Sequence, residues 1–390
     1  MADSIRDQVA VVGVGNSRQG QLPDLDNLGI AVEAFQAALD DAGLKKQDVD
    51  GIAVRPLDPG GVQWQGVART LGLNPRFGFG GNYGGASLTI AMQQAAMAIH
   101  HGLASTVAVL YATNSRTARR SFGGARYDWH APAGYFSPGA RLAMAFHRYM
   151  YDFCGVTSPA EEAVRPQQRK LGAIYVAMRR HASLNPIAYH SKPIDAEDYL
   201  ADRYICWPLR RGDYTLITDG GGCLILTSAE RARDFPKPPV YLSGMGQGHQ
   251  LRAQESPEYI YQRLMDGSAA ASVYASAGVG PGDIDAMYVY DSFSVLTLFA
   301  LENFGICKTG EGLDFVQDGR IELDGDFPVN TNGGHLAESY IGGVLQYVEA
   351  VRQLRGECGE RQIKKDIAQV LCCGEGGGAT NSAAVVLRKG

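Results

Sequence analysis

The sequence lacks the cysteine and histidine spacings that hold metal ions in proteins. Its seven cysteines contain no Cys-x-x-Cys pair, and its eight histidines form neither a His-x-His nor a His-Glu-x-x-His motif. We therefore expect no metal site in this chain. The odd, scattered cysteines also lack the spacing of a disulfide framework, which favours a reducing intracellular compartment.

Long hydrophobic runs are missing as well. Apolar segments such as VAVVGVG and STVAVLYA are too short to cross a bilayer. The first residues, MADSIRDQ, carry both charge signs and lack the apolar core of a signal peptide. A net charge of −5 disfavours binding to nucleic acid or to an anionic membrane. These features predict a cytoplasmic protein that binds neither.

Two common catalytic motifs are absent. No Gly-x-Ser-x-Gly elbow occurs, which disfavours a serine hydrolase. The run VGVGNS at 12–17 follows an apolar segment, as in dinucleotide-binding proteins, but its third glycine and the expected acidic residue are missing. We interpret this run as a tight structural turn.

The sequence does contain an internal repeat. Residues 37–54, AALDDAGLKKQDVDGIAV, correspond to residues 271–289, ASVYASAGVGPGDIDAMYV, after a shift of 235 positions. Each copy has the pattern of a helix ending at a glycine, followed by a short acidic turn and an apolar strand. Two further pairs of segments follow in the same order: VAVVGVGNS with VYLSGMGQG, and a helix led by Asn82 and glycines with one led by Asn330 and glycines.

The repeat predicts a duplicated α/β fold with sheets rich in parallel strands. The two glycine-led helices carry little charge along one side, so we expect them to be buried and to face each other. We divide the chain into an N-terminal half (1–112), an insertion with a closing strand (113–238) and a C-terminal half (239–390). The insertion is rich in arginine, tyrosine and proline, as lids and binding loops often are.

Four segments carry a resemblance to a known family: 176–226, VYDSF at 289–293, NTNGGHLAESY at 330–340 and CCGEGGG at 372–378. Together with the repeat, they resemble the thiolase superfamily of the sterol-carrier-protein type over nearly the whole chain. The resemblance implies a five-layered αβαβα sandwich with an inserted loop domain beneath which CoA thioesters bind. It also implies a reaction centre where the two central helices meet.

The sequence departs from that family at three of its four catalytic positions. Where the family has a nucleophilic cysteine at a helix start, this chain has Gly85. Tyr340 takes the place of the histidine in the family's Gly-His-Pro element, between Ser339 and Ile341. Tyr290 stands at the polar position of the Asn-Glu-Ala-Phe element, followed by Asp291. Without the thiol no acyl-enzyme forms there, so ordinary thiolysis is excluded.

At the fourth position, the family's proton-transferring cysteine corresponds to Cys372, or to Cys373 after a slip of one residue. Cys372 is equally compatible with a small buried thiol. His335 either lines the pocket or is a structural histidine. The predicted site therefore has a catalytic set and a set of pocket glycines. The catalytic set is Tyr290, Tyr340, Cys372, His335 and Asp291, and the pocket glycines are Gly84, Gly85, Gly334 and Gly374.

The substitutions suit the cleavage of a β-hydroxy thioester. Removing its hydroxyl proton lets the carbon–carbon bond break into a carbonyl compound and a thioester enolate, with no need for a nucleophile. Tyrosine can act as the acid or the base if its pKa is tuned by its neighbours. Replacing cysteine by Gly85 is also expected to open space for a bulky β-carbon.

Within the superfamily, the lost cysteine and the two tyrosines resemble the steroid side-chain-cleaving aldolases. The resemblance implies retro-aldol cleavage of a steroid or bile-acid side-chain β-hydroxyacyl-CoA to a 17-keto steroid and a short acyl-CoA such as propionyl-CoA. It implies a homodimer that forms a heterotetramer with a separate OB-fold protein. The zinc would lie in that partner's zinc ribbon, and this chain would bind no cofactor. Which of Tyr290 and Tyr340 is the base stays open.

Two other functions stay open. One is a thiolase-like acyltransferase that uses Cys372, and the other is an inactive scaffold that binds CoA or lipid. Four arginines of the insertion either meet CoA phosphates or belong to solvated basic loops: Arg116, Arg119, Arg120 and Arg126.

Overall fold

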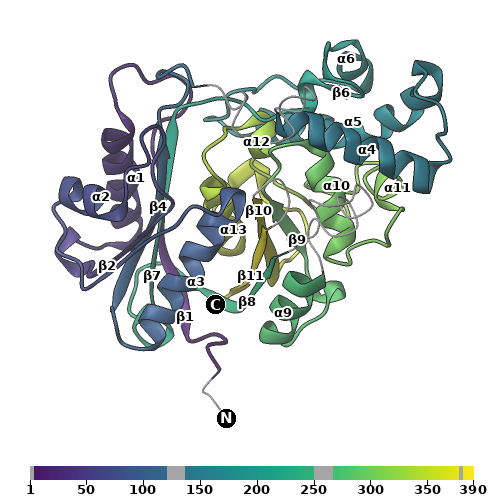
Figure 1. The fold of residues 1–390 in the computed structure, drawn as a ribbon. Helices are drawn as coiled ribbons and strands as arrows, with labels where there is room; N and C mark the ends of the chain where they lie inside the picture. The colour runs from purple at the N-terminus through teal and green to yellow at the C-terminus, as the bar shows by residue number, and fades with distance from the viewer. Residues whose placement is uncertain (1–3, 121–136, 250–266, 377–380) are drawn as a thin grey trace.

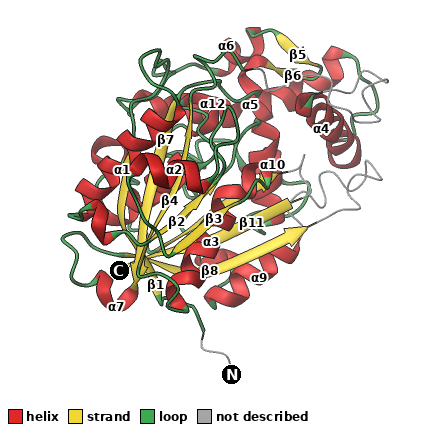
Figure 2. Ribbon diagram, turned by 60° about the vertical axis from the view of Figure 1, so that its left-hand side comes forward, coloured by secondary structure: helices red, strands yellow, loops and turns green. Residues whose placement is uncertain are grey.

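The computed structural model describes residues 4–120, 137–249, 267–376 and 381–390. Its main feature is a nine-stranded sheet in the order β3-β2-β4-β7-β1-β8-β11-β10-β9 (Figures 1 and 2). These strands are β1 Val9–Asn16, β2 Gly51–Val54, β3 Phe77–Gly80, β4 Thr106–Thr113, β7 Gly220–Ser228, β8 Val240–His249, β9 Ala286–Val289, β10 Gln369–Gly376 and β11 Asn381–Lys389.

The sheet is mixed. Among the described residues, β2 pairs in parallel with β3 and β4, and β9 with β10, whereas the other five pairs of neighbouring strands are antiparallel. The prediction of sheets rich in parallel strands is therefore wrong. The reason is that β7 and β11, which close the two halves, each insert antiparallel between two other strands.

The two halves repeat each other, as predicted. Helix α1 (Asn27–Ala42) ends at Gly43 in the left-handed conformation and leads into β2. Helix α9 (Gly267–Ala277) is followed by Gly278, also left-handed, and leads into β9. The halves join through β1 and β8, which share only the pairs Ala10–Tyr241 and Val11–Val240.

The helices form layers on both sides of each half-sheet. Helix α3 (Ser87–His100) and helix α13 (Val344–Arg355) both contact strands of the two halves, so they form the central layer (Figure 1). Thr89 of α3 contacts the hydroxyl of Tyr347 of α13 across this layer. Helices α1 and α2 (Trp64–Leu71) cover the N-terminal half, and α9 and α10 (Ser294–Asn303) cover the C-terminal half. The predicted five-layered αβαβα sandwich is confirmed.

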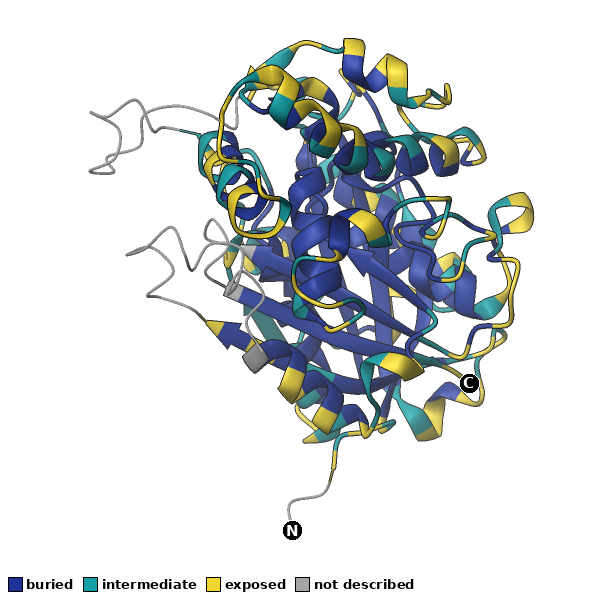
Figure 3. Cartoon of the chain, turned by 90° about the vertical axis from the view of Figure 1, so that its right-hand side faces the viewer, coloured by how far each residue is buried: buried dark blue, intermediate teal, exposed yellow. Residues whose placement is uncertain are grey.

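The insertion adds a helical layer above the C-terminal half (Figure 1). Its described elements are α4 Pro138–Cys154, α5 Glu161–Ser183, α6 Ala196–Ala201, β5 Tyr204–Cys206 and β6 Leu209–Arg210. In Figure 3 the sheet is almost entirely buried, whereas these outer helices expose one face. Three further short α-helices of the described residues are α7 Ala229–Ala232, α11 Gly312–Phe315 and α12 Gly334–Ala337. The domain boundaries after residues 112 and 238 stay a prediction.

The segment after Asn330 differs from its predicted form. Instead of one helix that starts at the glycine pair, the chain forms the single turn α12, a loop, and then α13 from Val344. Four glycines interrupt it in the left-handed conformation: Gly333, Gly334, Gly342 and Gly343. That conformation is unfavourable for other residues and ends a helix. The loop between α12 and α13 is thereby free to carry Tyr340 into the interior.

A helix long and apolar enough to span a membrane does not occur among the described residues. The same residues contain no group of three or more histidine, cysteine, aspartate or glutamate side chains placed to hold a metal ion.

Candidate active site

The structure brings Tyr290 and Tyr340 together. Their hydroxyl oxygens lie 2.6 Å apart, and either can donate the hydrogen bond. The two rings meet edge to face, with centroids 6.0 Å apart, and both residues are buried. The sequence placed these tyrosines 50 positions apart in two separate motifs, and the fold makes them one polar group. Their catalytic roles stay a prediction.

Tyr290 follows directly after β9, at the end of the strand. Its backbone N–H donates to the carbonyl of Cys373 on β10, at 3.0 Å, which continues the parallel pairing of the two strands by one residue. Burial raises the pKa of the Tyr290 phenol well above its usual value near 10, and Tyr340 raises it further, whereas Arg55 lowers it. Burial and Tyr340 therefore favour the protonated phenol, whereas Arg55 favours the phenolate.

Tyr340 lies on the loop between α12 and α13, and residue Thr218, just before β7, fixes that loop. The Tyr340 backbone N–H donates to the Thr218 hydroxyl oxygen at 3.0 Å, and the Ser339 hydroxyl lies 2.7 Å from the same oxygen. Ile341, which stands where the family has proline, packs near Gly220. The insertion and the C-terminal half therefore position this tyrosine jointly.

His335 lies against both tyrosines. Its ring centroid is 4.6 Å from that of Tyr290 and 5.0 Å from that of Tyr340. The side chain is fully buried, and neither ring nitrogen has a hydrogen-bond partner among the residues that the structure describes. Burial, assisted by the Arg55 charge, lowers the pKa of His335 to about 3, so the imidazole is neutral at pH 7. The sequence left both a pocket-lining and a structural role open for His335, and the structure places it beside both tyrosines.

Asp291 is the second buried group beside the tyrosines. Its Oδ1 accepts hydrogen bonds from the His335 backbone N–H at 2.8 Å and from Gln346 Nε2 at 3.2 Å. Within the described part of the chain its Oδ2 has no hydrogen-bond partner, and it lies against Gly334, where a Cβ would be 2.0 Å away. Burial raises the pKa of Asp291 to about 7. The glycine is required here because any side chain would collide with the carboxylate.

Gly85 lies in the short turn Gly84–Ala86 that precedes α3, and it lies against Tyr290. A Cβ at this position would be 2.6 Å from two ring carbons of Tyr290 and 2.0 Å from the Glu375 carbonyl oxygen. The expectation that losing the cysteine opens space is therefore wrong, because the Tyr290 ring fills the position. The Tyr290 ring therefore occupies the space that a side chain at residue 85 would need.

The other pocket glycines allow similar close approaches. Gly374 packs against the backbone of Gly85, whose carbonyl oxygen would be 2.4 Å from a Cβ at residue 374. Gly84 and Gly334 have φ angles of +63° and +61°, which favour glycine. All four predicted glycines thus lie in tight or left-handed backbone around the two buried phenols.

The two neighbouring cysteines are buried on opposite faces of β10. Cys372 packs into the core beneath α13, and Cys373 packs into the core of the C-terminal half. Burial raises the pKa of both thiols well above the usual range. A thiol becomes a nucleophile only as its thiolate, so this environment opposes catalysis by either residue. The predicted role of Cys372 is not supported by its surroundings.

Sequence reasoning missed two buried charged residues near the tyrosines. Arg55 follows the last residue of β2, and its Nη1 has no hydrogen-bond partner in the described ranges. Glu375 lies on β10, and its Oε2 has no partner among the residues described; burial raises the pKa of its carboxyl to about 8. A charged residue directly after an uninterrupted apolar strand was the available signal for Arg55.

Two of the insertion arginines, Arg116 and Arg120, have side-chain partners within the protein. The Arg116 guanidinium lies over the Tyr189 ring and donates to the Ile217 carbonyl at 3.2 Å. Arg120 pairs with Asp58 at 3.7 Å. Arg119 is described, with a φ of +52°, and Arg126 lies outside the described residues. Contact of these four arginines with CoA phosphates stays a prediction.

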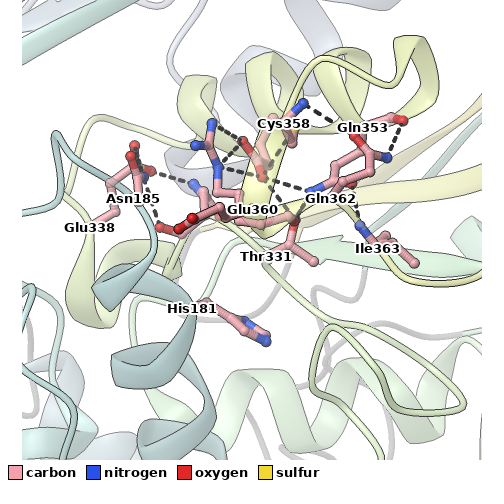
Figure 4. Close-up of polar contacts among 12 residues, drawn as sticks. His181, Asn185, Thr331, Glu338, Gln353, Cys358, Glu360, Gln362 and Ile363 are labelled. Atoms are coloured by element: carbon pink, nitrogen blue, oxygen red, sulfur yellow. Dashed lines mark hydrogen bonds and ion pairs between the residues drawn. The ribbon is translucent and has the colours of Figure 1, made fainter.

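A buried polar network holds the segment 330–340 that carries His335 and Tyr340 (Figure 4). Asn185 of the insertion donates to the Glu338 carboxylate at 3.1 Å, and Thr331 donates to Glu349 at 3.0 Å. Arg361 forms an ion pair with Glu349, also at 3.0 Å. Such a network fixes the backbone only if its members are satisfied, which is the case for these pairs.

Comparisons with known proteins show what the whole chain is similar to. Residues 247–389 match the model of the thiolase C-terminal domain-like family. The chain is 37% identical over 369 residues to 17-hydroxy-3-oxo-4-pregnene-20-carboxyl-CoA lyase of Mycobacterium tuberculosis, covering 90% of this chain and 92% of that one. It is 35% identical over 365 residues to the steroid side-chain-cleaving aldolase of Thermomonospora curvata, covering 89% and 90%.

A solved structure described as the Ltp2-ChsH2(DUF35) aldolase superposes with a TM-score of 0.87 at 33% identity, covering 99% of both chains. The match extends over both halves and the insertion, so the relationship concerns the whole architecture. The chain therefore belongs to the thiolase superfamily, in the family that contains these side-chain-cleaving relatives.

Proposed function

We propose that this chain is a carbon–carbon lyase that cleaves the side chain of a steroid or bile-acid β-hydroxyacyl-CoA. The products are a 17-keto steroid and a short acyl-CoA such as propionyl-CoA. In the name of the Mycobacterium tuberculosis relative, the hydroxyl is on carbon 17 and the CoA ester on a carboxyl attached to carbon 20. That hydroxyl is β to the thioester carbonyl, as a retro-aldol reaction requires.

The reaction removes one proton from the substrate hydroxyl and adds one to the α-carbon, so no net proton is gained or lost. A base takes the proton of the β-hydroxyl, and the bond between the α- and β-carbons breaks as the hydroxyl oxygen becomes a ketone. The bonding electrons pass into the thioester as an enolate, and an acid protonates its α-carbon. Tyr290 and Tyr340 are the proposed acid–base pair, and neither forms a covalent bond to the substrate.

The observation that carries this proposal is the 2.6 Å contact between two buried phenols beside the position of the family's nucleophile. A β-keto thioester needs a nucleophile to attack its carbonyl, and Gly85 offers none. A β-hydroxy thioester needs only proton transfer, which two adjacent phenols can perform. The site is therefore suited to the second substrate and unsuited to the first.

The partner and the location are part of the proposal. The description of the superposed structure names two components, which supports a separate partner protein. We propose that this partner is an OB-fold protein with a zinc ribbon, and that it forms a heterotetramer with a homodimer of this chain. Strand β3 lies at the sheet edge, so it is a suitable strand for edge-to-edge pairing of two copies. We propose that this chain binds no cofactor. All seven cysteines are unpaired, which suits the cytoplasm.

The test is product analysis. The chain, co-expressed with the OB-fold partner, is incubated with a 17-hydroxy steroid side-chain CoA ester, and products are identified by liquid chromatography and mass spectrometry. We expect equal amounts of the 17-ketone and the short acyl-CoA, without consumption of free CoA. Cleavage that needs added CoA, or no cleavage with the partner present, would contradict the proposal.

The acyltransferase and scaffold hypotheses make different predictions. An acyltransferase that uses Cys372 gives a protein adduct with a labelled acyl-CoA, which the buried thiol opposes. A scaffold binds the CoA ester but leaves it intact. The product analysis separates the lyase from both, because only the lyase releases a ketone, and labelling with an acyl-CoA then separates the acyltransferase from the scaffold.

A further inference from the structure

Arg55 is a buried cation whose charge is incompletely paired. The residue follows the apolar strand β2 and is 8% exposed. Its Nη1 has no hydrogen-bond partner in the part of the chain that the structure describes, and its Nη2 lies 3.9 Å from Asp58, beyond hydrogen-bond distance. A guanidinium keeps its charge in proteins. A buried donor without a partner is costly, so it indicates a place where another group binds.

Asp58 does not compensate this charge alone. Its carboxylate also accepts a hydrogen bond from Tyr111 at 3.2 Å and pairs with Arg120 at 3.7 Å. The Arg55 guanidinium lies over the Tyr111 ring, 4.7 Å from its centroid, which is an attractive contact but adds no counter-charge. Two guanidinium groups thus share one carboxylate, and Arg55 retains an excess of positive charge.

This guanidinium lies beside the tyrosine pair. A Cβ at Gly342 would be 2.9 Å from Arg55 Nη1, and a Cβ at the next residue, Gly343, would be 3.1 Å from the Tyr290 ring. Burial raises the pKa of the Tyr290 phenol, and the charge and hydrogen bonding of Arg55 oppose that rise, so the two groups are neighbours. The unpartnered nitrogen therefore adjoins the loop that carries Tyr340, within reach of the reaction centre.

Residual exposure separates the groups that a ligand can reach from those behind them. Tyr290 and Tyr340 are 6% and 8% exposed, which is close to the value for Arg55, whereas His335 and Asp291 are fully buried. A ligand can therefore touch Arg55 and the two phenols without displacing other side chains. It cannot touch His335 or Asp291 in that way.

Arg55 is also the permanent positive charge at this place. Burial lowers the pKa of His335 to about 3, so its imidazole is neutral at pH 7. Burial raises the carboxyl pKa of Asp291 to about 7 and that of Glu375 to about 8, so neither is a full counter-charge. Negative charge that forms next to the tyrosines during a reaction is therefore attracted to Arg55.

From this geometry we infer that Arg55 binds the thioester oxygen of the substrate and stabilises the negative charge that forms on it. The inference rests on the proposed function. When the bond between the α- and β-carbons breaks, its electron pair passes into the thioester, and the thioester oxygen becomes the enolate oxygen. Arg55 donates an N–H of Nη1 to this oxygen and transfers no proton. The charge disappears when the α-carbon is protonated, so Arg55 ends the cycle unchanged. A charge-assisted hydrogen bond that strengthens as the charge develops lowers the barrier.

Two CoA thioethers of equal length test this contact on the full chain with its partner. One ends in a carboxymethyl group, whose carboxylate carries the negative charge of an enolate, and the other ends in a neutral carbamoylmethyl group. Isothermal titration calorimetry measures both dissociation constants without turnover. We expect the wild type to bind the carboxylate about 10- to 100-fold more tightly than the amide, and Arg55→Met to bind both equally. Arg55→Lys should keep only part of the preference, because an ammonium lacks the planar fork of N–H groups.

Arg355→Met is the matched control. Arg355 is also a buried arginine with a nitrogen that is unpartnered among the described residues, but it lies on the last turn of α13 and pairs with Asp41 at 2.9 Å. Its substitution should lower thermal stability and leave the carboxylate preference unchanged. In the kinetics, Arg55→Met should lower kcat about 100-fold with little change in KM, because the charge forms only as the bond breaks.

The outcomes separate the inference from the proposed function. A wild type without the preference, or a folded Arg55→Met or Arg55→Lys variant with the full preference, would overturn the inference. An equal loss of the preference in Arg355→Met would overturn it too. Binding of the thioethers needs no cleavage, so a preference that depends on Arg55 in a protein that leaves the steroid CoA ester intact would contradict the proposed function alone.

Discussion

At the scale of single residues, the site depends on the glycine at position 85, which leaves room for the ring of Tyr290. Gly85 has no side chain, and the Tyr290 ring lies where one would begin. Compared with the family, the site lacks the nucleophilic thiol and has a phenol in the same space. A side chain restored at residue 85 would collide with both the Tyr290 ring and the Glu375 carbonyl oxygen.

Gly85→Ala should therefore lower both stability and turnover. Its Cβ would be 2.0 Å from a backbone oxygen, so the backbone or Tyr290 has to move, at a cost of about 1–3 kcal/mol. Chemical denaturation measures the free energy of unfolding. Gly282→Ala is the control, because nothing lies within 4 Å of a Cβ there. Gly85→Cys should lose stability in the same way and gain no thiolase activity, and robust thiolysis would contradict this account of the site.

Asp291 gives the free energy of unfolding a distinct pH dependence. Its carboxyl has a pKa near 3.8 when unfolded and about 7 when folded. Between these values the folded state holds the extra proton, so stability falls as pH rises. Asp291→Asn removes this component, and its stability relative to the wild type should rise by about 2–3 kcal/mol from pH 5 to pH 8. Denaturation curves at the two pH values check this, and equal differences would contradict the burial argument.

The sequence was sufficient to place both tyrosines at family positions, but not to find Arg55. Motif comparison reports only where a known pattern has changed, and Arg55 belongs to no motif that was compared. Its segment, GIAVRPLDP, has the pattern of a strand followed by a turn, and an arginine there is usually exposed. Only the packing of β2 against the Tyr340 loop shows that it points inward.

At the scale of elements, the segment between β9 and α13 does most to shape the site. Its glycines break what the sequence suggested was one helix, and the loop turns Tyr340 toward Tyr290. Local periodicity could not locate that break, because the segment contains helix-forming residues between its glycine pairs. The antiparallel insertion of β7 and β11 was equally hidden, since strand direction depends on the path of the whole chain.

The ion pair between Arg361 and Glu349 should be a main support of this segment. Both side chains are largely buried, at 12% and 3% exposed, so Arg361→Met leaves a buried carboxylate without its cation. We expect a loss of about 3–5 kcal/mol in the free energy of unfolding. Arg180→Met removes the more exposed partner of Glu322 and should cost less than about 1 kcal/mol. Equal losses in the free energy of unfolding for the two variants would show that the network of Figure 4 stabilises the protein no more than a surface ion pair does.

At the scale of the whole molecule, the site lies where three parts of the chain meet. The N-terminal half contributes Gly85 and Arg55, the C-terminal half contributes the tyrosines, and Thr218 near the end of the insertion fixes the Tyr340 loop. The sequence repeat was sufficient to predict this duplicated architecture. It could not predict that β1 and β8 would join the halves into one continuous sheet.

The proposed homodimer is a prediction at this scale. Analytical ultracentrifugation of the chain without its partner should give twice the chain mass of 41.8 kDa, because the edge strand β3 offers unpaired backbone groups to a second copy. A species of single-chain mass at micromolar concentration would contradict edge-to-edge pairing and would require another basis for the heterotetramer.

The most direct test of the two-phenol account is single-turnover cleavage by three tyrosine variants. Tyr290→Phe and Tyr340→Phe each remove one hydroxyl of the pair, and we expect each to slow ketone release at least about 100-fold while CoA-ester binding is kept. Tyr288→Phe, two residues away on β9, removes a buried hydroxyl bonded to Thr331 at 3.0 Å and should cleave at a rate within a few-fold of the wild type. If all three variants cleave equally fast, the paired phenols do not carry the reaction.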